Sequence, residues 1–74
     1  MNKLNFRYET NYSESQKSDI KDQIDDAIKN GYVKVKPTDE VEVIVESIDP
    51  LNQSFEAVLR VQSKTIKIIK GQLN

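Results

Sequence analysis

The chain has 74 residues, the size of one small domain spanning 1–74. It contains no cysteine and no histidine, and eleven Lys and Arg residues against twelve Asp and Glu residues leave a formal charge of −1. This composition excludes disulfide scaffolds, zinc fingers and every mechanism that depends on a catalytic Cys or His. It also argues against a protein that binds nucleic acid through bulk positive charge.

The N-terminal part predicts a strand and then a helix. Three apolar residues alternate with polar ones, as in a half-buried strand: Leu4, Phe6 and Tyr8. Ser13 is suited to cap a helix over about residues 14–29, because Gln16 three positions later completes a capping box. The apolar stripe of this helix consists of Ile20, Ile24, Ala27 and Ile28. Asn30-Gly31 predicts its end, because glycine adopts the left-handed conformation without steric cost.

The second half predicts three more strands. Alternating apolar residues place them within 41–46, 55–62 and 65–70, with Gly71 ending the last one. A turn is expected at 49–52, and 32–36 forms either a short edge strand or an extended linker, because Pro37 stops the alternation. The predicted fold class is α+β with the order β-α-(β)-β-β-β, in which one mostly antiparallel sheet carries a single helix on one face. The crossover helix makes the strands on either side of it parallel, or separates them by another strand.

The register of the predicted strands defines an outer stripe. A two-residue turn at Ser63-Lys64 places Val58 opposite Ile69. The valines of the strand 41–46 must face the buried side, and this condition places Ile44 opposite Val58. Ile44, Val58 and Ile69 then form an apolar stripe on the outer face, beside an aligned row of Glu42, Arg60 and Lys67. Two interpretations of the stripe remain open: apolar residues present for their β propensity, or a contact surface for a partner.

The inner face of this sheet exceeds what one helix can cover. Only the four apolar residues of the helix are available to cover twelve inward residues of the strands. These twelve are Leu4, Phe6, Tyr8, Val41, Val43, Val45, Phe55, Ala57, Leu59, Val61, Ile66 and Ile68. Self-association would cover the remainder, and the alternative is that the segment 32–37 folds over the gap.

No constellation of residues predicts catalysis. Asp22, Asp25 and Asp26 share one side of the helix, and a solvated face is favoured over a cation site because Lys21 and Lys29 lie within pairing distance. No histidine is present to activate a serine, and no glycine-rich phosphate loop exists. We therefore expect a protein that is not an enzyme and has no cofactor, no metal and no small-molecule substrate.

The basic residues support a weaker alternative. Six of them were considered as phosphate or RNA contacts: Lys34, Lys36, Arg60, Lys64, Lys67 and Lys70. The acidic segment 37–56 offers the opposing explanation, because adjacent strands of opposite charge pair internally.

The pattern resembles the ribosome hibernation promoting factor family, also called protein Y or the ribosome-associated inhibitor group. The similar segments are the opening Met1-Asn2-Lys3-Leu4-Asn5-Phe6, the helix through Ile24, the strand 41–45, and the hairpin through 57–62 and 65–67. The resemblance implies a β-α-β-β-β-α domain that binds ribosomes, truncated here before the second helix. It assigns RNA contacts only to Arg60, Lys64 and Lys67.

Together these patterns predict a small non-enzymatic protein-interaction or regulatory domain that forms a homodimer through its sheet or binds a protein partner. The alternatives are a truncated hibernation-factor-like ribosome or RNA binder, and a phage-type inhibitor of a host protein. No apolar run reaches the length of a membrane span or a signal peptide, so a cytoplasmic location without membrane contact is expected.

Overall fold

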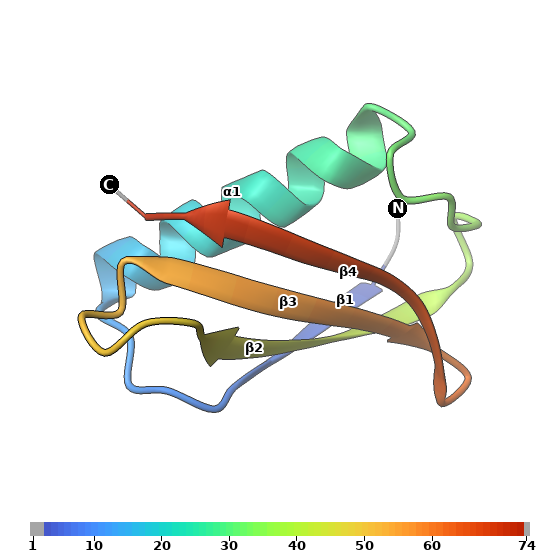
Figure 1. Cartoon of the computed structure of the whole chain (residues 1–74). Coiled ribbons are helices and arrows are strands. Elements are labelled where there is room, and N and C mark those ends of the chain that lie inside the picture. Colours follow the sequence, from blue (N-terminus) through green and yellow to red (C-terminus); the bar gives the residue numbers. More distant parts are fainter. Residues whose placement is uncertain (1–2, 74) are drawn as a thin grey trace.

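The computed structural model describes residues 3–73, in which one helix lies across one face of a four-stranded sheet (Figure 1). The elements in chain order are β1 (Lys3–Tyr8), α1 (Glu14–Lys29), β2 (Glu40–Ser47), β3 (Ser54–Val61) and β4 (Lys64–Gln72). The strand order is β1-β2-β3-β4, with β1 parallel to β2 and the other neighbours antiparallel. The predicted α+β class is confirmed. Met1 and Asn2 of the predicted opening strand lie outside the described residues.

The helix has the predicted bounds because its end signals are local. The Gln16 backbone N–H donates to Ser13 Oγ at 3.1 Å, and the Ser13 N–H donates to Gln16 Oε1 at 2.8 Å, so the capping box is complete. At the other end the helix stops at Lys29, with Asn30 as its C-cap, and Gly31 follows with φ of +76°. The connection from β1 through α1 to β2 is a crossover, which explains why these two strands are parallel.

The core lies between α1 and the inner face of the sheet, the face turned toward the helix. Ile20 and Ile24 are fully buried against apolar residues of the two central strands: Val41, Val43, Val45, Phe55, Ala57 and Leu59. Tyr12 and Val33 are also buried, at 7% and 2% exposure, and the Val33 N–H donates to the carbonyl of Ala27 at 3.1 Å. Residues 32–37 form no strand, so this segment is the extended linker of the two alternatives. Val33 from this segment covers part of the inner face, as the second of the two explanations for that face expects.

The register between β3 and β4 differs from the predicted one by two residues at the turn and by one residue beyond a β-bulge. The turn is at Gln62-Ser63, whose φ values of 53° and 65° are those of a two-residue hairpin, and Val61 pairs with Lys64. A β-bulge then accommodates Ile66, so that Val58 lies opposite Ile68 and Ala57 opposite Ile69. Because strand side chains alternate, this shift turns Ile69 inward and Ile68 outward.

The β2–β3 connection is held by one carboxylate. Asp49 Oδ1 accepts the backbone N–H groups of Leu51 and Gln53, each at 3.0 Å, and Asp49 Oδ2 accepts the Ser54 hydroxyl. The Ser54 hydrogen bond and then the backbone N–H of Gln53 lower the pKa of Asp49, since both stabilise the charged form. The predicted turn at 49–52 is therefore present, with the side chain of its first residue organising it.

Asp49→Asn is expected to lower the melting temperature at pH 7, because an amide cannot replace both acceptor oxygens of the carboxylate. Because the pKa of Asp49 is lower in the folded state, its ionised carboxylate stabilises the fold above the unfolded-state pKa of about 4. This stabilisation is lost as the pH falls through the pKa of the folded state. The variant should thus lose less stability than wild type below about pH 4. Thermal melts from pH 7 to pH 2 measure this. Asp22→Asn, the same change on an exposed helix position, is the control, and equal acid sensitivity of both variants would contradict the assignment.

Candidate functional site

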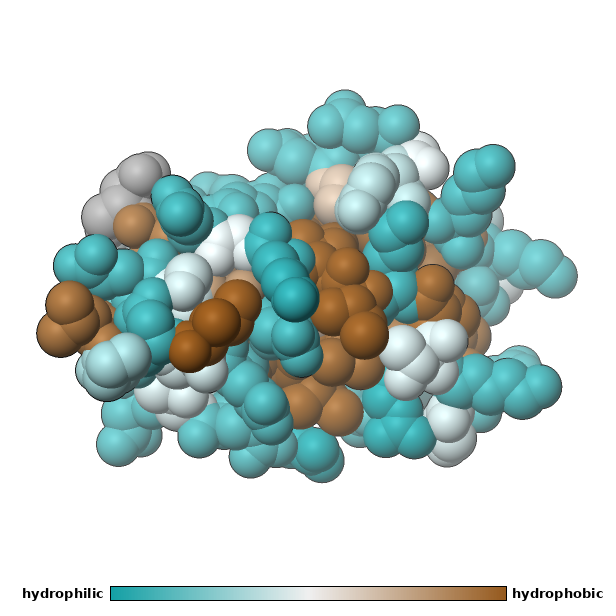
Figure 2. All heavy atoms as spheres, viewed as in Figure 1, coloured by the Kyte–Doolittle hydropathy of each residue, from teal (hydrophilic) through white to brown (hydrophobic). Residues whose placement is uncertain are grey.

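The outer face of the sheet, turned away from α1, carries an apolar row across its middle. The register places Arg7, Ile44, Val58 and Ile68 side by side, one from each strand. Ile44 and Val58 are half-buried by their neighbours, and Ile68 is 50% exposed. Figure 2 shows hydrophobic atoms at the centre of the molecule, over β3 and β4, bordered by hydrophilic ones. We call Ile44, Val58 and Ile68 the outer row.

The structure keeps two of the three predicted stripe residues and replaces the third. Ile44 and Val58 pair as predicted, whereas the prediction of Ile69 on the outer face is wrong: Ile69 packs against the core. Ile68 takes its place, and the prediction that Ile66 and Ile68 face inward into the core is also wrong, since they are 40% and 50% exposed. The physical reason is the bulge at Ile66, which shifts every following side chain of β4 to the opposite face.

Charges of both signs surround the outer row in equal number. The strand residues of the outer face include four basic side chains and four acidic ones: Lys3, Arg7, Arg60 and Lys70 against Glu40, Glu42, Glu46 and Glu56. Glu42 lies opposite Arg60 as predicted, with 3.6 Å between Glu42 Oε1 and Arg60 Nη1. Lys67 does not extend that row, because the shifted register turns it to the inner side.

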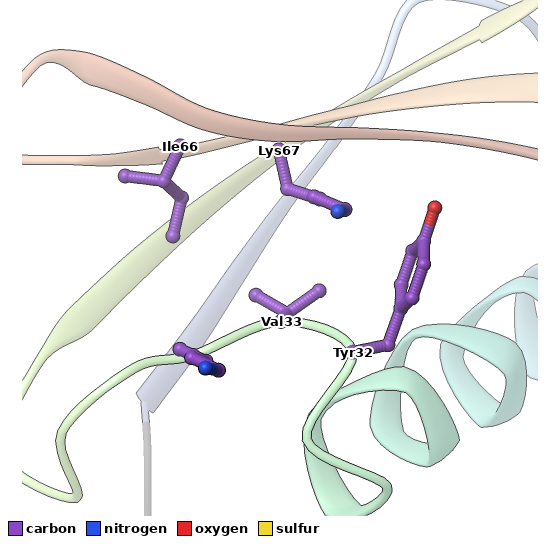
Figure 3. A pocket seen from close by; sticks show the side chains of 5 residues that line it. Tyr32, Val33, Ile66 and Lys67 are labelled. Atoms are coloured by element: carbon purple, nitrogen blue, oxygen red, sulfur yellow. The ribbon is translucent and has the colours of Figure 1, made fainter.

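A second feature lies beside the start of β4, where a hollow of about 280 Å³ opens between the strand and the segment after α1. Tyr32, Val33, Lys34, Ile66 and Lys67 line it (Figure 3). Lys67 Nζ lies 4.0 Å from the centre of the Tyr32 ring, a cation–π contact. Val33 forms the buried floor, and Tyr32 remains 58% exposed.

The six basic residues considered for phosphate binding do not form one patch. Lys34 and Lys67 line the hollow, whereas Arg60 and Lys70 lie on the outer face. Lys64 is exposed beside the β3–β4 turn, and the Lys36 N–H donates to Asp39 Oδ2 at 2.9 Å in the linker before β2. The basic residues are thus divided between two sides of the sheet.

Within residues 3–73, no group of three or more carboxylates has the arrangement of a metal site. The three aspartates of α1 therefore do not form one. No helix in the described part of the chain has the length and apolar character needed to cross a membrane.

Comparison of the chain with protein-family models, with curated proteins and with solved structures gave no match. The resemblance to the hibernation factors therefore stays a prediction.

Proposed function

We propose that the protein is a small protein-interaction domain that self-associates through the outer face of its sheet. The observation that carries this proposal is the outer row, in which Ile44, Val58 and Ile68 lie side by side on a face that neither α1 nor Val33 covers. Burying such apolar surface contributes about 25 cal/mol per Å². Because Val33 and Tyr12 supplement the helix on the inner face, the outer face is the better candidate for the interface.

A second copy of the chain is the occupant that the charges favour. The outer face has four basic and four acidic strand residues, so it has no net charge that would repel a second copy or a neutral surface. A two-fold axis parallel to the strands, between β2 and β3, would lay β2 of one copy over β3 of the other. Ile44 would then pack on Val58 of the second copy, and Glu42 would face Arg60 of the second copy, twice per dimer. The same axis brings Glu46 to Glu56 of the second copy, a like-charge contact that lowers the affinity.

The size of the face predicts a weak dimer. Four strands about 4.8 Å apart and about eight residues long cover roughly 500 Å². Stable interfaces bury about 800 Å² per partner, so this one belongs to the transient class. We therefore expect association that depends on concentration rather than a permanent dimer.

Val58→Lys is expected to reduce self-association, because it places a charge at the centre of the outer row without touching the core. The weight-average mass, measured by light scattering over a concentration series, should fall toward the 8.5 kDa of one chain. The circular dichroism spectrum should stay that of the wild type. Ser18→Lys introduces the same side chain on an exposed position of α1 and serves as the matched control, expected to associate like wild type.

Ile68→Glu should act in the same direction as Val58→Lys, since Ile68 lies on the outer face and not in the core. A wild-type chain that stays monomeric at millimolar concentration would contradict self-association. A folded Val58→Lys variant with unchanged mass would contradict the choice of face.

Phosphate or ribosome binding receives less support from the geometry, because the six basic residues lie on two sides of the sheet. The phage-type inhibitor also receives less support, since Glu42 of the acidic segment pairs with Arg60 of the neighbouring strand.

A further inference from the structure

The free edge of β4 is a second surface of this domain, distinct from the outer face. Among the strands of the described residues 3–73, β4 is the last in the sheet and pairs only with β3. It has nine residues, and α1 reaches it at its C-terminal end, where Gln23 Nε2 donates to the carbonyl of Gln72 at 2.9 Å. In its first half, Thr65, Ile66 and Ile68 are exposed. An exposed strand edge offers unpaired backbone groups to another extended chain.

The lysines of β4 oppose pairing with a second copy at this edge. Lys64, Lys67 and Lys70 recur at every third position. In a symmetric antiparallel pair centred on Lys67, Lys67 would lie opposite its own copy, on the same face of the sheet. Like charges directly opposite each other destabilise a strand pair. The edge is therefore charged in a way that disfavours self-pairing and favours an acidic chain.

The hollow beside this edge gives the acidic chain a specific contact. Its five lining residues include two ammonium groups, those of Lys34 and Lys67, and no carboxylate. Lys67 Nζ lies 4.0 Å from the centre of the Tyr32 ring (Figure 3). This contact keeps the ammonium group beside the hollow instead of free in solvent at the edge of the strand. Val33 and Ile66 supply apolar walls (Figure 3). A carboxylate with an apolar neighbour on an extended chain matches this lining.

We propose that an extended acidic peptide segment adds as a fifth strand to the free edge of β4 and places a carboxylate in the hollow formed by Tyr32, Lys34 and Lys67. Backbone hydrogen bonds to the edge supply affinity, and the hollow selects for the acidic side chain. This inference goes beyond self-association and uses a different surface.

The test uses a fluorescein-labelled peptide with a centre of alternating valine and glutamate, flanked by glycine and serine. Two matched peptides replace the glutamates with lysine or the central valine with proline, which removes a backbone donor. Titrations use the whole protein in the Val58→Lys background, so that failure of the dimer and failure of the edge are separate results. We expect binding of the acidic peptide, with amide shifts in two-dimensional NMR spectra confined to β4 and the segment 32–34. The lysine and proline peptides should bind at least tenfold more weakly.

Lys67→Glu should weaken binding of the acidic peptide roughly tenfold, and Tyr32→Ala should weaken it less, because Lys67 keeps its charge but loses its orientation. Lys21→Glu, the same charge reversal on an exposed position of α1, should leave binding unchanged. Equal binding of the acidic and proline peptides would overturn strand addition. Three results would each overturn the site. The first is an equal loss of affinity for Lys67→Glu and Lys21→Glu, and the second is amide shifts outside β4 and 32–34. The third is no binding of the acidic peptide at millimolar concentration.

Discussion

Ile24→Ala is expected to lower the free energy of unfolding by about 2–4 kcal/mol, because it removes three buried carbons from a site that cannot collapse. Ile24 is fully buried between α1 and the sheet, at the centre of the helix's apolar stripe. A domain of this length has a total stability of about 4–11 kcal/mol. The variant should therefore lose a large share of its stability, and urea unfolding followed by circular dichroism measures it.

The matched control is Ile48→Ala, the same chemical change at a loop residue that is 51% exposed. Its free energy of unfolding should stay within about 0.5 kcal/mol of wild type. An Ile24→Ala variant that melts within a degree or two of wild type would contradict the docking of α1 on the sheet.

Gly71→Ala is expected to destabilise the domain by about 1–3 kcal/mol through overpacking. A Cβ atom on Gly71 would lie 2.6 Å from Phe55 Cε1 and 2.5 Å from Gln23 Oε1. The amide of Gln23 ends a flexible side chain and can move, whereas the Phe55 ring is fully buried and cannot. The Phe55 ring therefore carries the cost. Thermal melts of Gly71→Ala and wild type give the difference in stability.

A double-mutant cycle separates this steric effect from backbone effects. Phe55→Leu alone should destabilise the domain, but in the Gly71→Ala background it should cost less, because it removes the ring atoms that the new methyl group meets. Additive effects of the two substitutions would contradict the proposed clash. Gln23→Ala in the Gly71→Ala background should restore little stability.

The helix and the β2–β3 pair were predictable from the sequence because their signals are local or redundant. Ser13, Gln16 and Gly31 act within one turn of the helix ends, and they place both boundaries. In β2 and β3, apolar residues line one face at every second position, and a slip of one residue would expose all of them. That constraint, together with the loop across Asp49 to Ser54, gives the pairing of Val43 with Leu59 and of Ile44 with Val58.

The side chains of β4 were not predictable in the same way. Ile66, Ile68 and Ile69 give both faces of this strand apolar residues, so either register buries an isoleucine. The turn at Gln62-Ser63 has no glycine to mark its two positive φ values. Packing decided the register: Ile69 reaches the core, and Gly71 leaves room for the ring of Phe55.

The sequence by itself thus determined the fold class, the helix with its caps, and two members of the outer row, because these depend on periodicity and on contacts between neighbours in the chain. Only the tertiary structure decided that Ile68 completes the outer row, that Val33 covers the core, and that Lys67 meets Tyr32. The bulge at Ile66 sets the faces of Ile68 and Lys67, and the path of residues 32–37 places Val33 and Tyr32. Both are set by which apolar side chains fit against the helix and the sheet together.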